Sequence, residues 1–146
     1  MTRVLRTAEE RRRDIQLNAD RMGIDDAYIS VLVETFYARI RADAALGPIF
    51  DREIGDNWGP HLARMKDFWA SVAMNAGRYT GKPLPAHMKL TGVDASHFRI
   101  WLGLIRQTLE DTAPSAEAVP YFMERAERIA SSLQLAMFGL PGLARH

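Results

Sequence analysis

The chain has 146 residues, a length that suits one domain. Its 19 basic and 18 acidic residues leave a net charge of +1, which is too small for a protein built to bind nucleic acid. A hydrophobic fraction of 47% excludes a disordered chain. The absence of cysteine excludes disulfides, zinc-thiolate sites, iron–sulfur clusters and covalent haem attachment through a Cys-x-x-Cys-His motif.

Residues 1–25 are polar and charged, and they are predicted to form an N-terminal extension with at most one helix, which ends at the RMGIDD stretch. This segment lacks the apolar core of an export signal. Nowhere does the chain hold about 18 consecutive apolar residues, the number needed to span a bilayer. We therefore expect a cytoplasmic protein without a membrane partner.

Long amphipathic helices are predicted after residue 28, because apolar residues recur at spacings of three and four. The apolar face of the first helix is formed by Ile29, Leu32, Val33, Phe36, Tyr37 and Ile40. Gly47 and Pro48 are expected to interrupt this helix and residues 51–60 to form a loop, with Pro60 in the first turn of the next helix. That second helix runs to about Gly77, and its apolar face is formed by His61, Met65, Phe68, Trp69, Val72 and Ala76.

A short segment separates the second long helix from the third. Gly81 and Pro83 end the preceding helix, Pro85 suits the first turn of a new short one, and His87 falls near its middle. Asp94 or Ser96 is expected to cap the third long helix, whose apolar face is formed by Phe98, Trp101, Leu102, Ile105 and Leu109. The fourth follows Pro114-Ser115 and ends at Gly139, and its apolar face is formed by Val119, Phe122, Met123, Ala126, Ala130, Leu133 and Met137. No strand-like alternation is present, so the predicted fold class is all-α.

Four reactive or hydrogen-bonding side chains stand on apolar helix faces: Tyr37, His61, His87 and Trp101. Each could be a core residue whose polar atom simply finds a partner. His97, close to a helix start, is expected to be exposed. One histidine among apolar residues suits haem iron better than zinc, which needs three or four protein ligands. From the residues alone, a haem protein and a cofactor-free helical interaction module both stay open.

Four segments between residues 28 and 139 together resemble the group III truncated globins: FYARIRADAALGPIF, HLARMKDFW, GRYTGKPLPAH and HFRIWLGL. The most specific features are Phe36-Tyr37, His61, the Tyr-x-Gly-x-Pro-x-x-x-His run that ends at His87, and Trp101. The paired-glycine motifs of groups I and II are missing, which agrees with group III. Residues 1–25 lie outside the resemblance.

The resemblance implies a globin-like, truncated two-over-two helical sandwich, formed by residues 26–142, around a non-covalent b-type haem (iron protoporphyrin IX). It places His87 as the proximal ligand of the iron. The expected haem contacts are Phe50, His61, Met65, Phe68, His87 and Trp101. The expected lining of the distal ligand site is Phe36, Tyr37, His61, Met65 and Trp101.

The resemblance also implies the binding of O₂, CO, nitric oxide or peroxide as small ligands. Hydrogen bonds from the Tyr37 hydroxyl and the Trp101 indole would slow O₂ release, which suits ligand chemistry or sensing better than bulk delivery. Redox turnover of O₂, nitric oxide or peroxide would need a reductase, which the sequence does not identify. His61, at the start of its helix, would either gate ligand entry or bind the iron itself. No residue is assigned as catalytic, and whether the protein is an enzyme stays open.

Overall fold

The structure, a computed structural model, describes residues 7–75, 77 and 92–139. Within these residues the elements are α1 (Ala8–Arg21), α2 (Asp26–Ala42), α3 (Leu46–Ile54), α4 (Trp58–Met74), α6 (Ala95–Thr112) and α7 (Ala118–Phe138). The predicted all-α class is confirmed. The predicted short helix around His87 lies outside the described residues. None of the described helices is long and apolar enough to cross a membrane.

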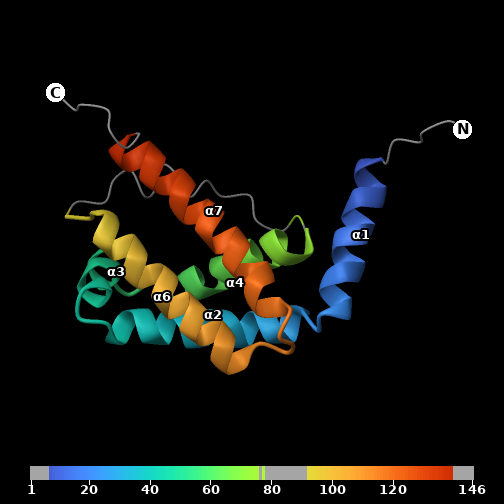
Figure 1. The fold of residues 1–146 in the computed structure, drawn as a ribbon. Helices are drawn as coiled ribbons and strands as arrows, with labels where there is room; N and C mark the ends of the chain where they lie inside the picture. The colour runs from blue at the N-terminus through green and yellow to red at the C-terminus, as the bar shows by residue number, and fades with distance from the viewer. Residues whose placement is uncertain (1–6, 76, 78–91, 140–146) are drawn as a thin grey trace, which may run out of the picture.

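Two pairs of helices form the body of the protein. α2 and α4 pack against each other in antiparallel directions, and α6 and α7 form a second antiparallel pair that crosses the first (Figure 1). α3 packs on α2 at one end of the first pair, and α1 projects from the opposite end. The arrangement is the two-over-two sandwich that the resemblance implied.

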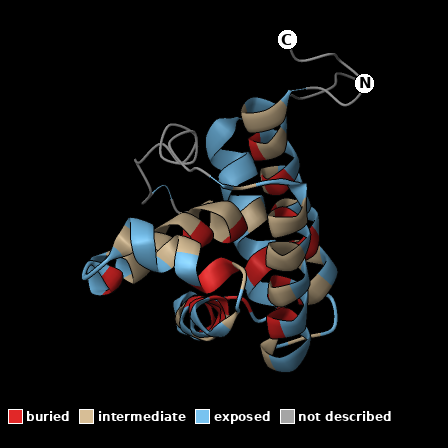
Figure 2. Cartoon of the chain, turned by 90° about the vertical axis from the view of Figure 1, so that its left-hand side faces the viewer, coloured by how far each residue is buried: buried red, intermediate tan, exposed pale blue. Residues whose placement is uncertain are grey.

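One main hydrophobic core lies between the two pairs, where the buried residues gather on the inner helix faces (Figure 2). Each long helix contributes a large buried side chain: Phe36 from α2, Trp69 from α4, Leu109 from α6 and Phe122 from α7. Trp69 and Phe122 meet with their ring centroids 6.1 Å apart. Every residue that the helical spacing predicted for the apolar face of α2 is buried, as are most of those predicted for α7. On α4 the prediction was less accurate, since Trp69 alone among the predicted residues that the structure describes is buried there.

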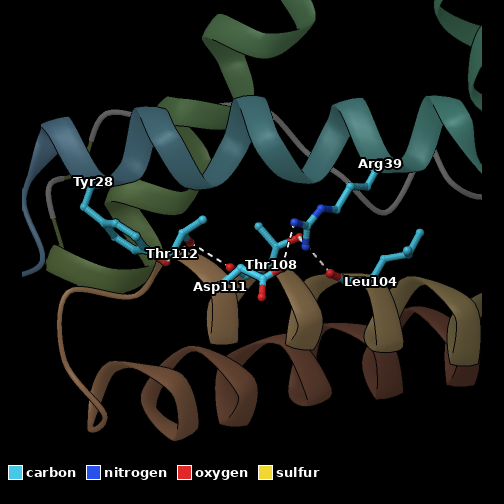
Figure 3. Close-up of polar contacts among 6 residues, drawn as sticks. All are labelled: Tyr28, Arg39, Leu104, Thr108, Asp111 and Thr112. Carbon is cyan, nitrogen blue, oxygen red and sulfur yellow. Dashed lines mark hydrogen bonds and ion pairs between the residues drawn. The ribbon is translucent and has the colours of Figure 1, made fainter.

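Polar contacts join α2 to α6 along the seam between the two helices, from the buried Thr108 to the partly exposed Arg39 and Asp111 (Figure 3). Arg39 forms an ion pair with Asp111 at 2.7 Å, and its other terminal nitrogen donates to Thr108 Oγ1 at 3.3 Å. Thr108 is fully buried, and its hydroxyl donates to the carbonyl oxygen of Leu104 at 2.8 Å. The hydroxyl thus both donates and accepts, so burial leaves no polar atom of Thr108 unsatisfied.

The same seam continues one helical turn further along α6, where Tyr28 of α2 meets Thr112 (Figure 3). The Tyr28 hydroxyl lies 3.0 Å from Thr112 Oγ1, and the Thr112 hydroxyl donates to the Thr108 carbonyl oxygen at 2.7 Å. Because Thr112 has one hydroxyl hydrogen, Tyr28 is the donor of the first bond. Burial raises the pKa of Tyr28, so this donor keeps its proton at neutral pH. These bonds fix how α2 lies against α6.

The end of α1 contacts the turn between α6 and α7. Arg21 forms an ion pair with Glu117 at 2.9 Å, and the Ser115 hydroxyl donates to the Met22 carbonyl oxygen at 2.7 Å. The predicted helix end in RMGIDD is confirmed, since α1 stops at Arg21 and Asp25 caps α2. The N-terminal segment is therefore attached to the body at its C-terminal end.

The first long helix is interrupted as predicted, but the break comes earlier than Gly47 and Pro48, since α2 ends at Ala42. Residues 46–54 form the helix α3, so the predicted loop from residue 51 is wrong. Pro48 lies in the first turn, where a proline loses no intrahelical hydrogen bond. The Asp43 carboxylate starts this turn by accepting the backbone N–H of Leu46 at 2.9 Å. Only residues 55–57 separate α3 from α4, whose first turn holds Pro60 as predicted.

Gly47 lies at a close approach between α3 and the end of α2. A Cβ at this position would stand 2.5 Å from the backbone carbonyl oxygen of Arg41. Gly47→Ala is therefore expected to lower the free energy of unfolding by about 1–3 kcal/mol, measured by urea denaturation. The matched control is Gly103→Ala in α6, where nothing lies within 4 Å of the added methyl group. That control is expected to raise the free energy of unfolding by about 0.4–1 kcal/mol, and equal effects of the two changes would contradict the close approach.

His97 has a capping role that the sequence did not indicate. Its side chain is 19% exposed, not freely exposed as expected, because its Nδ1 atom accepts the backbone N–H of Asp94 at 3.0 Å. Asp94 caps α6 in return and accepts the backbone N–H of Ser96 at 2.8 Å. Hydrogen bonds from the side chain and then the backbone of Ser96 lower the pKa of Asp94. This contribution to stability is therefore lost as the pH falls through the lowered pKa.

Candidate functional site

Two consecutive residues of α2, Phe36 and Tyr37, lie at the centre of an aromatic cluster. Both are buried, with 0% and 5% of their surface exposed. Consecutive helix residues point about 100° apart, so the two rings reach different neighbours. The Phe36 ring meets Trp101 of α6 at 5.5 Å between centroids, and the Tyr37 ring meets His61 of α4 at 5.2 Å and Phe50 of α3 at 6.2 Å. This pair thus joins side chains from four helices.

His61 lies against the aromatic cluster in this structure. Its ring meets Tyr37 edge-on, with an interplanar angle of 85°, and meets Trp58 in the same way at 5.6 Å and 86°. Its Nε2 atom is buried. The imidazole is therefore in an inward position, held between two aromatic rings.

Apolar side chains continue from His61 along one face of α4. Met65 and Phe68 follow at spacings of four and three residues, which places all three on the same helix face. Both are half-buried and pack on the core, as Phe50 of α3 and Trp101 of α6 also do. These large side chains leave apolar surface that a flat apolar ligand could cover.

The Trp101 ring is positioned by the hydrophobic core. It stacks on Trp69 with centroids 6.4 Å apart and an interplanar angle of 23°, while Phe36 meets it at an angle of 72°. Trp69 is almost completely buried and also contacts Phe68 and Phe122. Rigid core residues therefore hold the indole of Trp101 in place.

The structure brings together most of the residues that were predicted for the site. Ring contacts connect five of them in one cluster: Phe36, Tyr37, Phe50, His61 and Trp101. Met65 and Phe68 share the α4 face with His61. His87 lies outside the described residues, so its role as the iron ligand stays a prediction.

Trp58 belongs to this cluster, although the sequence predicted a loop at this position. It is the first residue of α4, is 9% exposed, and contacts both Tyr37 and His61. Its spacing of three residues from His61 was the signal that could have revealed it, since residues three apart share a helix face. The signal was hidden because the surrounding glycines and polar residues favoured a loop.

Two charged residues hold Trp58 from the side of α2 and α3. The Trp58 indole Nε1–H donates to Asp51 Oδ1 at 3.1 Å, and Arg41 Nε lies 3.4 Å from the same oxygen. The Arg41 guanidinium carbon stands 4.4 Å from the centroid of the Trp58 ring, a cation–π distance. Neither Arg41 nor Asp51 was singled out in the sequence, because an exposed charge carries no periodic pattern.

Comparison with known proteins gives the same family from sequence and from structure. The chain is 34% identical to the group 3 truncated hemoglobin ctb of Campylobacter jejuni over 122 residues, which are 82% of this chain and 95% of that protein. It is 29% identical over 100 residues to the group 1 truncated hemoglobin GlbN of Mycolicibacterium paratuberculosis, which are 68% and 71% of the two chains. No protein-family model matches the sequence.

A solved structure matches at the level of the fold. The crystal structure of a group III truncated hemoglobin from Campylobacter jejuni superposes with a TM-score of 0.76 at 34% identity, and the match covers 82% of this chain and 96% of that one. The two-over-two fold is therefore that of a truncated globin. This protein belongs to the group III truncated haemoglobin family. Membership implies a haem-binding globin.

Proposed function

We propose that residues 26–142 of this protein form the globin domain, bind a b-type haem non-covalently, and bind O₂ and other diatomic ligands at its iron, with residues 1–25 as an extension. The observation that carries the proposal is the ring cluster of Tyr37, His61 and Trp101 beside the half-buried apolar face of α4. A haem is flat and mostly apolar, so it requires such apolar surface on both of its sides. The described residues fit one side of it.

Each predicted residue has a distinct part in this proposal. His87 would hold the iron from the proximal side, and Phe50, Met65 and Phe68 would contact the porphyrin. When bound, the haem supplies a ferrous iron to which a diatomic ligand binds reversibly. All further selectivity would come from the side chains around that ligand.

Tyr37 and Trp101 are the proposed hydrogen-bond donors to the ligand. Tyr37 is 5% exposed, and a hydrogen bond is stronger where water is excluded. Two donors would favour tight retention of O₂, because O₂ on ferrous iron gains negative charge. Slow release would suit redox chemistry on O₂, nitric oxide or peroxide, with electrons from a reductase, better than bulk delivery.

The direct test of the proposal is the absorption spectrum of the purified protein. We expect a Soret band that shifts when the protein is reduced and exposed to CO, with one haem bound per chain in a titration of the haem-free protein. A colourless protein that takes up no haem would refute the proposal. The alternative, a cofactor-free helical interaction module, would then be favoured.

His61→Ala is expected to change the association rates of O₂ and CO by a larger factor than their dissociation rates. The reason is that the inward imidazole occupies space beside Tyr37, and a ligand must pass it. Flash photolysis gives association rates, and stopped-flow displacement gives dissociation rates. His97→Ala is the control, because His97 caps α6 and has no ring contact with this cluster among those that the structure describes. A larger change in dissociation would mean that His61 holds the ligand directly.

A further inference from the structure

We propose that Arg41, Asp51 and Trp58 form a clamp that holds the His61 imidazole against Tyr37, so that release of the clamp sets how often His61 moves aside for a ligand. This inference rests on the proposed function, since it concerns ligand entry to the haem. Trp58 is a positioning residue in this inference, because it acts through His61. The three clamp residues come from three consecutive helices, at the end of α2, within α3 and at the start of α4.

The Trp58 ring is held at its edge and on its face. Its indole N–H donates to Asp51 Oδ1 at 3.1 Å, and the guanidinium of Arg41 lies over the ring at 4.4 Å. Arg41 Nε also lies 3.4 Å from the same Asp51 oxygen, so the carboxylate draws both partners together. A hydrogen bond with a charged acceptor is stronger than one between neutral groups. The indole therefore has one preferred position.

Trp58 is in direct contact with His61, so its position limits where the imidazole can lie. The two residues are three apart on α4, and their rings meet edge-on at 5.6 Å. Tyr37 meets both rings, at 6.2 Å for Trp58 and at 5.2 Å for His61, so the three rings contact one another pairwise. Displacement of the imidazole must break its contact with Trp58, and that step is easier when the indole can shift.

The clamp differs from ordinary core packing because its charged half is open to solvent. The side chains of Arg41 and Asp51 are 50% and 51% exposed, whereas Trp58 is 9% exposed. Dissolved salt screens exposed charge pairs and leaves buried contacts largely unaffected. A clamp of this kind should therefore loosen as the ionic strength rises, while the core around Phe36 should not.

The experiment measures CO association after flash photolysis in the haem-loaded ferrous protein. Trp58→Phe removes the indole N–H and keeps an aromatic ring, while Asp51→Asn removes the charge and keeps the shape. Each is expected to speed CO association about three- to tenfold, the effect of losing one partly exposed hydrogen bond on the opening equilibrium. CO dissociation is expected to stay near its original rate. Asp56→Asn is the matched control, since it removes an exposed charge from the connection between α3 and α4 and should leave the rates unchanged.

A double-mutant cycle separates the clamp from a general structural effect. In a His61→Ala background, Trp58→Phe and Asp51→Asn should cause no further change, because the group that they hold is gone. A second readout is hydrogen exchange of the Trp58 indole N–H, followed by NMR in the CO complex. This exchange should become faster in Asp51→Asn and at high salt, and it should stay unchanged in Asp56→Asn.

The outcomes distinguish the clamp from the proposed function. A protein that takes up no haem would refute the proposed function before any rate is measured. A haem-loaded protein with unchanged CO association in both Trp58→Phe and Asp51→Asn would overturn the clamp and leave the proposed function intact. The clamp would also be overturned if the acceleration persisted in full without His61.

Discussion

Replacing His87 by alanine is expected to leave the purified protein with little or no bound haem. The proposal assigns this histidine the main bond between protein and iron, and apolar contacts alone then have to hold the cofactor. The ratio of Soret to protein absorbance measures the haem content, and the ferrous spectrum reports the coordination of any haem that remains. The absorbance ratio is expected to fall at least severalfold.

His97→Ala is the matched control for this prediction, since it removes a histidine that caps α6 and is not among the expected haem contacts, so it should leave the haem content unchanged. A further variant, His87→Gly, makes room for an added imidazole, which should restore haem retention if the lost group is an iron ligand. A His87→Ala protein with an unchanged ferrous spectrum would refute the assignment. His61 would then be the better candidate for the iron ligand.

Tyr37→Phe and Trp101→Phe are each expected to speed O₂ release about five- to thirtyfold, if each lost hydrogen bond contributes roughly 1–2 kcal/mol. Tyr37→Phe removes the hydroxyl group alone, because the phenyl ring can keep the contacts that the Tyr37 ring makes with Phe50, Trp58 and His61. Trp101→Phe also reduces the ring area that stacks on Trp69, so part of its effect on O₂ release would come from lost packing contacts. The measurement is O₂ dissociation by stopped flow.

Comparison of the two gases identifies the cause of such an acceleration. CO carries less negative charge on its outer atom than O₂ does, so its release should change much less. Because both donors act on one ligand, the double variant should differ from the sum of the single changes. Equal changes for O₂ and CO would indicate altered packing, and fast O₂ release from the unmodified protein would contradict tight retention.

The sequence by itself predicted the helices whose apolar residues repeat at helical spacing. The predicted face with Ile29, Phe36 and Ile40 is buried in α2, and the predicted cap Asp94 begins α6. It also predicted the family, because Tyr37, His61 and Trp101 stand at characteristic intervals along the chain. Such features could be predicted because they depend on residues that are close in sequence or on the order of short motifs.

How the segment between α2 and α4 folds, and what it contacts, depends on tertiary contacts that the sequence pattern does not reveal. Gly47 and Pro48 are ordinary helix breakers in the sequence, yet they lie in the first turn of α3. The Asp43 carboxylate accepts the backbone N–H of Leu46 there, and the Arg41 carbonyl leaves no space for a Cβ at residue 47. Trp58 was predicted to lie in a loop because the glycines and polar residues around it favour a loop in the sequence.

The clamp around Trp58 could not be predicted because its parts have no common period in the sequence. Arg41, Asp51 and Trp58 belong to three helices, and their contacts exist only once α3 has turned the chain back on itself. The helical faces and the order of the motifs could be predicted from the sequence, since both are local properties. Which polar and aromatic side chains contact each other depends on the fold, because a hydrogen bond such as that from Trp58 to Asp51 forms only between atoms that the fold has brought within about 3 Å.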